Sequence, residues 1–210
     1  MRHIILLLSL FIFTSQAFAQ ATQQAPTGTT NPDMSVFGIT LGQRFDIPEC
    51  TKRKIGGSFM YSVPKTVCFE RLSGREGQTG EITNDTVLVK FPFSEAPQIS
   101  TTGNLMIGVI DGKLESVGFN TAGVRFQEYA LAKLIEKYGK PHTLIPHKLK
   151  TRIGATFDTF VASWSFPNLF VTFDSVSFKL DSGLVNIDTK KGKEDRERAL
   201  KELLKDKRPL

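Results

Sequence analysis

Short strand-like runs separated by turn residues, with one long amphipathic helix between them, constrain the fold of this chain most. Apolar and polar residues alternate over 86–93, and the runs 105–110 and 114–120 flank Asp111-Gly112. Asp-Gly is favoured in two-residue hairpin turns because both central residues need a positive φ. We therefore expect an α+β fold in which antiparallel sheet is packed by a central helix and a C-terminal helix.

The central helix is predicted over 124–137. Its apolar face is formed by residues that recur at spacings of four: Phe126, Ala130, Leu134 and Tyr138. Such spacing places side chains on one side of a helix. Gly139 is well placed as the C-terminal cap, and Pro141 prevents continuation.

Several other segments are assigned from pattern and turn residues. Strands are predicted over 67–71, 157–166, 169–173, 176–180 and 184–188. The alternation of inward-facing apolar residues is interrupted at Asp174-Ser175, which indicates a bulge or a tight turn. Trp164 lies on an aromatic stripe of period two, which is typical of a buried sheet face. Before these strands, 36–50 is expected to form a turn and a short weak helix.

Two stretches of the chain resemble each other at an offset of 68–70 residues. Asp111 to Thr121 is echoed by Asp181 to Thr189, and an amphipathic helix follows each. The echo predicts two copies of a strand-rich unit, over 36–121 and 122–189, within one α+β domain over 36–189. Their sheets would join edge to edge or share one core. The alternative is coincidence between amphipathic helices of common composition.

The N-terminus has the three parts of a secretory signal peptide. Arg2 precedes an apolar run over 4–13, and Ala17-Phe18-Ala19 supplies small residues for signal peptidase. A membrane-spanning helix needs about 20 apolar residues, so the run is too short to be one. We expect cleavage after Ala19, no transmembrane segment in the mature chain, and a periplasmic or secreted location. An uncleaved anchor is the alternative.

Export changes the interpretation of the two cysteines. Cys50 and Cys68 are an even pair in an oxidising compartment, which favours a structural disulfide. A redox pair or a metal site is the alternative, although the C-x-x-C spacing of redox pairs is absent.

The ends of the mature chain are polar. Residues 20–35 are polar and without periodicity, and they are expected to be a flexible leader. Residues 190–210 hold nine Lys or Arg against five Asp or Glu and predict a basic C-terminal helix with a short apolar stripe over 199–204. The helix either packs on the sheet or faces a partner or an anionic surface.

Basic residues mark two candidate contact regions. The formal net charge is +6, and loss of Arg2 with the signal peptide gives +5. Outside the cytoplasm such a charge meets anionic lipid or glycan more readily than nucleic acid. The candidate partner-binding or anion-binding residues, in a solvated loop over 140–152 and in the tail, are His147, Lys148, Lys150, Arg152, Arg198, Lys201 and Lys205.

The sequence contains few of the patterns that are typical of catalytic or metal-binding sites. His142 and His147 are spaced i, i+5 beside lysines and lack an acidic third ligand, so we predict no metal site and no cofactor. Phosphate-binding glycine loops and a serine nucleophile elbow are absent from the sequence. Paired carboxylates for a hydrolase could be assembled from four residues, but the sequence alone does not bring them together: Asp46, Glu49, Glu70 and Asp85.

A family resemblance rests on the second half of the chain. The phrase GVRFQEYALAKLIEKYGKP, followed by FVASWSF, LFVTF and DSGLVNI, resembles the helix, Gly-x-Pro and Trp-strand pattern of small BamE/SmpA-like envelope domains, found in tandem in β-lactamase-inhibitory-type proteins. The match covers 124–189, with a degenerate version over 36–121. It implies a non-catalytic binding or assembly module. The chain departs from the family's lipoproteins because no cysteine follows the cleavage site.

The expected function is therefore that of an exported, non-enzymatic module that binds an envelope protein, as an inhibitor or an assembly accessory. Recognition of an anionic lipid or glycan through the basic loop and tail is the alternative, and a hydrolase is third.

Overall fold

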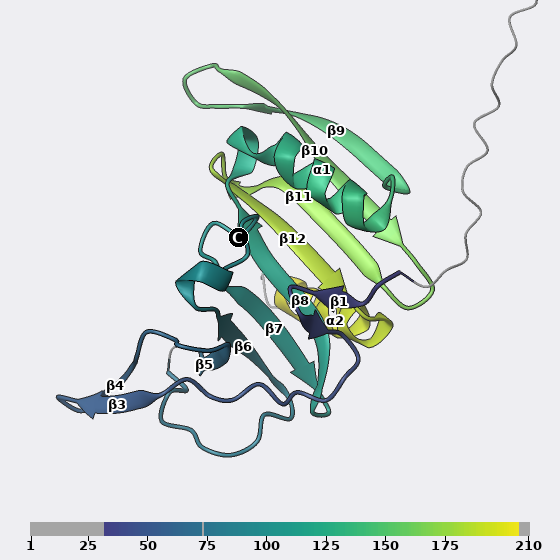
Figure 1. Cartoon of the computed structure of the whole chain (residues 1–210). Coiled ribbons are helices and arrows are strands. Elements are labelled where there is room, and N and C mark those ends of the chain that lie inside the picture. Colours follow the sequence, from purple (N-terminus) through teal and green to yellow (C-terminus); the bar gives the residue numbers. More distant parts are fainter. Residues whose placement is uncertain (1–31, 73, 206–210) are drawn as a thin grey trace, which may run out of the picture. The chain divides into compact units, whose positions relative to one another are not determined.

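Residues 32–72 and 74–205 are described by a computed structural model of the chain (Figure 1). Over these residues, eight strands form one antiparallel sheet in the order β5-β6-β7-β8-β12-β11-β10-β9. Two short two-stranded sheets and two α-helices accompany it in this part of the chain. The coarse α+β prediction is confirmed, and the fold is dominated by sheet. The signal peptide, its cleavage site and the leader up to residue 31 lie outside the described residues.

The first four strands of the large sheet form a meander. They are β5 (Cys68–Arg71), β6 (Asp85–Lys90), β7 (Leu105–Ile110) and β8 (Lys113–Thr121). Asp111 and Gly112 connect β7 to β8 with φ of 51° and 71°. These positive values confirm the predicted Asp-Gly hairpin, because a two-residue turn of this type needs both.

The remaining strands form a second meander. They are β9 (Thr143–Lys150), β10 (Thr156–Ser165), β11 (Phe170–Lys179) and β12 (Ser182–Asp188). β11 is one strand where two were predicted, and its pairing with β12 shifts after Asp174, so the bulge interpretation is confirmed. The meanders join edge to edge through antiparallel pairing of β8 with β12, in which Gly118 lies opposite Asn186.

One face of the sheet is apolar from β5 to β10. The side chains that fill it come from successive strands of the sheet, and all are at most 5% exposed: Phe69, Val89, Leu105, Val117, Ile187, Val171 and Trp164. Trp164 is 1% exposed and its indole N–H donates to the Gly139 carbonyl at 2.7 Å. The aromatic stripe is core, as its alternation predicted.

α1 (Gln127–Tyr138) covers the second meander on this face, where Figure 1 draws it across β10 and β11. Its buried side chains include Ala130, Leu134 and Tyr138. Phe126 was expected to join them but is 50% exposed. The helix starts late because Gly123–Arg125 forms a 3-10 turn whose Val124 N–H donates to the Leu180 carbonyl at 2.9 Å.

The segment that covers the first meander is not helical. β1 (Ser35–Val36) and β2 (Ile39–Thr40) form a tiny hairpin, so the helix predicted within 36–50 is wrong. The reason is local: Phe37 and Gly38 have φ of 51° and 79°, which is a two-residue hairpin turn. Hydrogen bonds from Gly42 N–H to the Leu114 carbonyl and from Phe45 N–H to the Gly112 carbonyl hold the segment on the sheet.

α2 (Lys190–Lys205) starts at the residue predicted for the basic tail but lies on the opposite face of the sheet from α1. It packs beside Asp188 and Phe170, which alternate with the buried Ile187 and Val171. Gly192 permits this contact, since a Cβ there would lie 2.1 Å from the Glu115 carbonyl oxygen. The two helices therefore lie on opposite faces of the sheet and are not arranged as two copies of one repeated unit would be.

Two further predictions are wrong. The segment 140–152 is not a solvated loop, because 143–150 pairs with β10 along its whole length as the edge strand β9. The alternating run over 86–93 places Phe93 at the end of a strand, but Phe93 begins a 3-10 turn after Pro92 and is 99% exposed. Proline lacks the amide hydrogen that would continue the strand ladder.

Candidate protein-binding surface

A two-stranded ribbon stands outside the large sheet (Figure 1). β3 (Lys52–Ile55) and β4 (Ser58–Tyr61) are joined by Gly56-Gly57, whose φ values are 57° and 89°. The sequence interpretation assigned no element to this segment. The Gly-Gly pair between two four-residue runs is the turn pattern that could have revealed it.

The two faces of the ribbon differ in what they contact. Lys52, Lys54 and Phe59 share the inner face by register, and both ammonium groups lie within 6 Å of the centre of the Phe59 ring. Lys52 also donates to the carbonyls of Glu76 and Gln78 at 2.8 and 3.4 Å. This face is therefore held by the loop that precedes β6.

The outer face of the ribbon carries apolar and cationic side chains. Ile55 and Met60 are 47% and 54% exposed, and Met60 lies opposite Arg53 in the register. Val63, just after the ribbon, is 88% exposed. Between Glu49 and Glu70 the sequence holds four Lys or Arg and no Asp or Glu. An exposed apolar patch with an arginine beside it is typical of a surface that contacts a partner.

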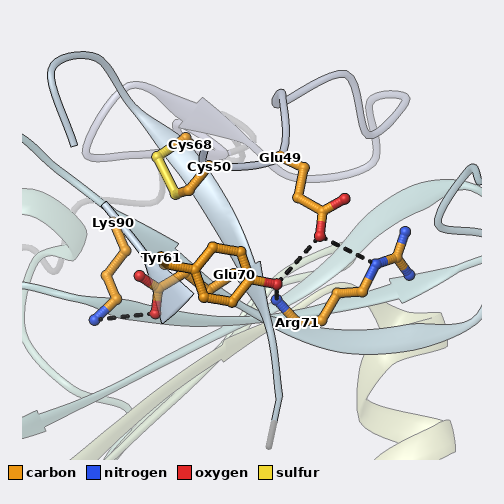
Figure 2. Close-up of a disulfide and its surroundings, with 7 residues drawn as sticks. All are labelled: Glu49, Cys50, Tyr61, Cys68, Glu70, Arg71 and Lys90. Carbon is orange, nitrogen blue, oxygen red and sulfur yellow. Dashed lines mark hydrogen bonds and ion pairs between the residues drawn. A yellow bond between two sulfur atoms is a disulfide. The ribbon is translucent and has the colours of Figure 1, made fainter. Parts of the chain in front are cut away.

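A disulfide fixes the base of the ribbon to the sheet (Figure 2). Cys50, immediately before β3, is bonded to Cys68, the first residue of β5. The Cys50 N–H donates to the Phe69 carbonyl and the Phe69 N–H donates to the Pro48 carbonyl, at 2.8 and 2.9 Å. The predicted disulfide is thus present, and the chain around it covers the outer edge of β5.

Glu49 is the centre of a polar cluster beside the disulfide (Figure 2). Its carboxylate accepts from the Lys52 ammonium at 2.7 Å and the Tyr61 hydroxyl at 3.1 Å, and it lies 3.4 Å from Nε of Arg71. Burial opposes ionisation of Glu49, but these partners together hold its pKa below the ordinary value. The Tyr61 hydroxyl also accepts from the Arg71 backbone N–H at 3.1 Å. The cluster therefore holds β4 against β5.

Three of the four carboxylates considered for acid–base chemistry lie beside cations and not beside one another. Glu49 interacts with Lys52 and Arg71, Glu70 lies 3.4 Å from the Lys90 ammonium, and Asp85 pairs with Arg75. Figure 2 shows Glu49 and Glu70 with their separate partners. A carboxylate bound to a cation is a structural element more often than a general acid or base.

The predicted contact residues occupy two separate surfaces. His147, Lys148 and Lys150 are exposed on β9, and Arg152 lies in the turn that follows. Arg198, Lys201 and Lys205 lie on α2, which contacts β8 and β12. Because β11 and β10 separate β12 from β9, the two groups do not form one anion-binding site.

The second half of α2 exposes its apolar stripe. Leu200, Leu203 and Leu204 are 55–66% exposed, although the first half of the helix is fixed by the ion pair of Arg196 with Asp188. Arg198 pairs with Asp195 on the helix itself. The first half of α2 is therefore packed on the sheet, whereas the leucines of its second half have no apolar partner among the described residues.

A groove of about 1000 Å³ lies between α2 and the polar face of the sheet. The charged groups along it pair with one another: Lys191 with Asp111, Arg196 with Asp188, and Arg198 with Asp195. Over the described ranges, no group of three His, Cys, Asp or Glu side chains is arranged to hold a metal ion. His142 uses Nδ1 to accept the Ser165 N–H at 2.8 Å.

Comparison with protein-family models, curated proteins and solved structures finds no significant match to this chain. No helix in residues 32–72 or 74–205 has the length and apolar character needed to cross a membrane.

Proposed function

We propose that this chain is an exported, non-enzymatic module that binds a protein partner through the β3–β4 ribbon. The observation that carries the proposal is a ribbon with exposed Ile55 and Met60 whose base is fixed by the Cys50–Cys68 disulfide. A rigid base lowers the entropy lost when the ribbon is held by a partner. The partner surface would be acidic around an apolar centre, to complement Arg53 on the outer face of the ribbon.

Two further features support an envelope location and this class of protein. The disulfide favours an oxidising compartment. The edge-to-edge meanders support a resemblance to tandem BamE/SmpA-like domains, since each meander would be one repeat. The position of α2 on the opposite face from α1 departs from a simple repeat, so the resemblance is proposed for the strands alone.

Binding of anionic lipid or glycan is the second candidate. It is favoured by the exposed leucines of α2 beside Lys201 and Lys205. The two candidates differ in salt dependence, because screening weakens a charge-driven lipid contact far more than an apolar protein interface.

Photo-crosslinking in the native cells tests the ribbon. A photoreactive residue at Met60 is expected to capture a discrete protein, and Arg53→Glu should reduce that capture at least about tenfold, as for a central interface residue. Met106, a strand methionine that is 46% exposed on β7, is the matched position for the probe. Equal capture from both positions, or capture of lipid alone at Met60, would contradict the proposal.

Maturation of the N-terminus is tested separately. The protein recovered from the envelope fraction is expected to begin at Gln20, because Ala17 and Ala19 satisfy the peptidase. N-terminal sequencing and intact mass measure this directly. A natural product that retains Met1, with both cysteines reduced, would refute export.

A further inference from the structure

The two edges of the eight-stranded sheet differ. The edge of β5 is covered by 48–50, which hydrogen bonds to Phe69 and is fixed by the disulfide. The other edge is β9, in which every residue except Leu149 is exposed. Within the described residues β9 pairs only with β10. An edge strand of this kind presents backbone donors and acceptors to a further strand.

The register shows which backbone groups of β9 face outward. The Thr151 N–H donates to the Ala155 carbonyl at 2.8 Å, in line with the β9–β10 register. Hydrogen-bonded pairs alternate along an antiparallel ladder, so 143, 145, 147 and 149 also face β10. The outward groups are therefore the carbonyls of 144, 146, 148 and 150 and the amides of Leu144, Lys148 and Lys150, because Pro146 has no amide hydrogen.

The charge on this edge defines what can pair with it. From Lys140 to Phe157 the sequence contains Lys140, Lys148, Lys150 and Arg152 and no Asp or Glu. Asp158, across the hairpin, pairs with Lys148 at 3.2 Å but both side chains are about four-fifths exposed. A second copy of β9 would bring like charges together, and Pro146 removes a central donor; both features oppose self-pairing.

We propose that β9 is a docking edge for an extended acidic segment of a partner protein, which adds to the sheet as a further strand. The backbone groups supply the pairing, and the cationic side chains select acidic neighbours. The site lies on the strand at the opposite edge from β5 and the ribbon, so the chain has two independent contact surfaces. Exposed Leu144 and Ile145 provide apolar contact on the two faces of the added strand.

Amide hydrogen exchange by NMR tests the proposal with the mature protein. The probe is a short end-blocked peptide in which glutamate alternates with valine or threonine, and the control peptide has lysine in place of glutamate. In the free protein the amides of Ile145, His147 and Leu149 should exchange slowly and those of Leu144 and Lys148 quickly. Saturating acidic peptide should slow exchange at Leu144, Lys148 and Lys150 at least about tenfold, and the lysine peptide should not.

Two substitutions separate backbone pairing from charge. Pro146→Val adds an outward amide and should tighten peptide binding about fivefold, the effect of one net hydrogen bond. Lys148→Pro removes both an outward amide and the charge, whereas Lys148→Gln removes the charge alone. The proline variant should therefore bind the peptide about fivefold more weakly than the glutamine variant. Neither change touches the amides that pair with β10.

Several outcomes would overturn the proposal. If Pro146→Val leaves peptide binding unchanged and the amides of Leu144, Lys148 and Lys150 are not protected, then the peptide contacts side chains of β9 and does not pair with its backbone. Protection that grows with protein concentration in the absence of peptide would identify a second copy as the occupant. Binding to phosphatidylglycerol vesicles without binding to the acidic peptide would identify the lipid surface instead. Each readout is independent of the ribbon variants.

Discussion

Replacing both cysteines, as Cys50→Ala with Cys68→Ala, is expected to lower the free energy of unfolding by about 3 kcal/mol. The disulfide closes a loop with a sequence separation of 18, and its loss restores that much chain entropy to the unfolded state. The covered edge of β5 should open as well, because the hydrogen bonds of 48–50 with Phe69 then depend on packing alone. Urea unfolding measures the first effect, and hydrogen exchange of the backbone amides at positions 68–71 measures the second.

The same double variant should release the ribbon. With its base unfixed, the Glu49 cluster must hold β4 alone, and we expect crosslinking from Met60 to fall at least about tenfold. Reduction of the unmodified protein with dithiothreitol should reproduce both effects and leave the double variant unchanged. Full stability and full crosslinking after reduction would show that neither fold nor function needs the disulfide.

Asp188→Asn is expected to stabilise the protein at neutral pH. The Asp188 side chain is 1% exposed at the base of α2, and its Oδ1 has no hydrogen-bond partner among the described residues. Burial raises the pKa of this carboxyl to about 6, against the opposing pull of Arg196 and Lys193. Its register neighbours, Phe170 and Ser116, carry no charge.

The raised pKa of Asp188 determines how the free energy of unfolding changes with pH. A carboxyl whose pKa is higher in the folded state favours folding when it is protonated, so its contribution is complete below the unfolded pKa of 3.8 and is lost as pH rises through about 6. The difference in unfolding free energy between Asp188→Asn and the unmodified protein should therefore be near zero at low pH. Above about pH 7 it should reach about 3 kcal/mol in favour of the variant.

Asp195→Asn is the matched control for this experiment. Asp195 pairs with Arg198 on the same helix, but its side chain is 44% exposed, and exposed pairs contribute at most about 1 kcal/mol. Its effect on unfolding should be small at every pH. If Asp188→Asn destabilises the protein at neutral pH, then the ion pair with Arg196 outweighs the burial of the carboxylate.

Local patterns predicted much of the sheet. The Asp111-Gly112 hairpin, the buried Trp164 and the capping Gly139 all follow from interactions within a few residues: positive φ, alternation and helix termination. The disulfide followed from the even pair of cysteines and the expected compartment. The pattern over 140–152 failed because an edge strand exposes both faces, so its composition resembles that of a loop.

The candidate site was much less accessible to sequence reasoning. The turn of the ribbon can be recognised in the sequence from Gly56-Gly57. The role of the ribbon, however, depends on the exposure of Met60 and on the contacts of Glu49 with Tyr61 and Arg71, which join residues distant in the chain. The predicted basic contact residues lie on two separate elements, β9 and α2. Local sequence could not reveal this separation, because strand order is a property of the whole sheet.

The sequence by itself determined most strands of the large sheet, the Asp111-Gly112 turn, both helices and the disulfide of this protein, since each depends on neighbouring residues or on a single pairing. Tertiary structure alone decided which edge of the sheet is covered and which face each helix packs against. Those outcomes depend on long-range contacts such as Gly192 on the Glu115 carbonyl and Phe69 with Pro48 and Cys50. Apolar spacing specifies that a face is buried, but not what buries it.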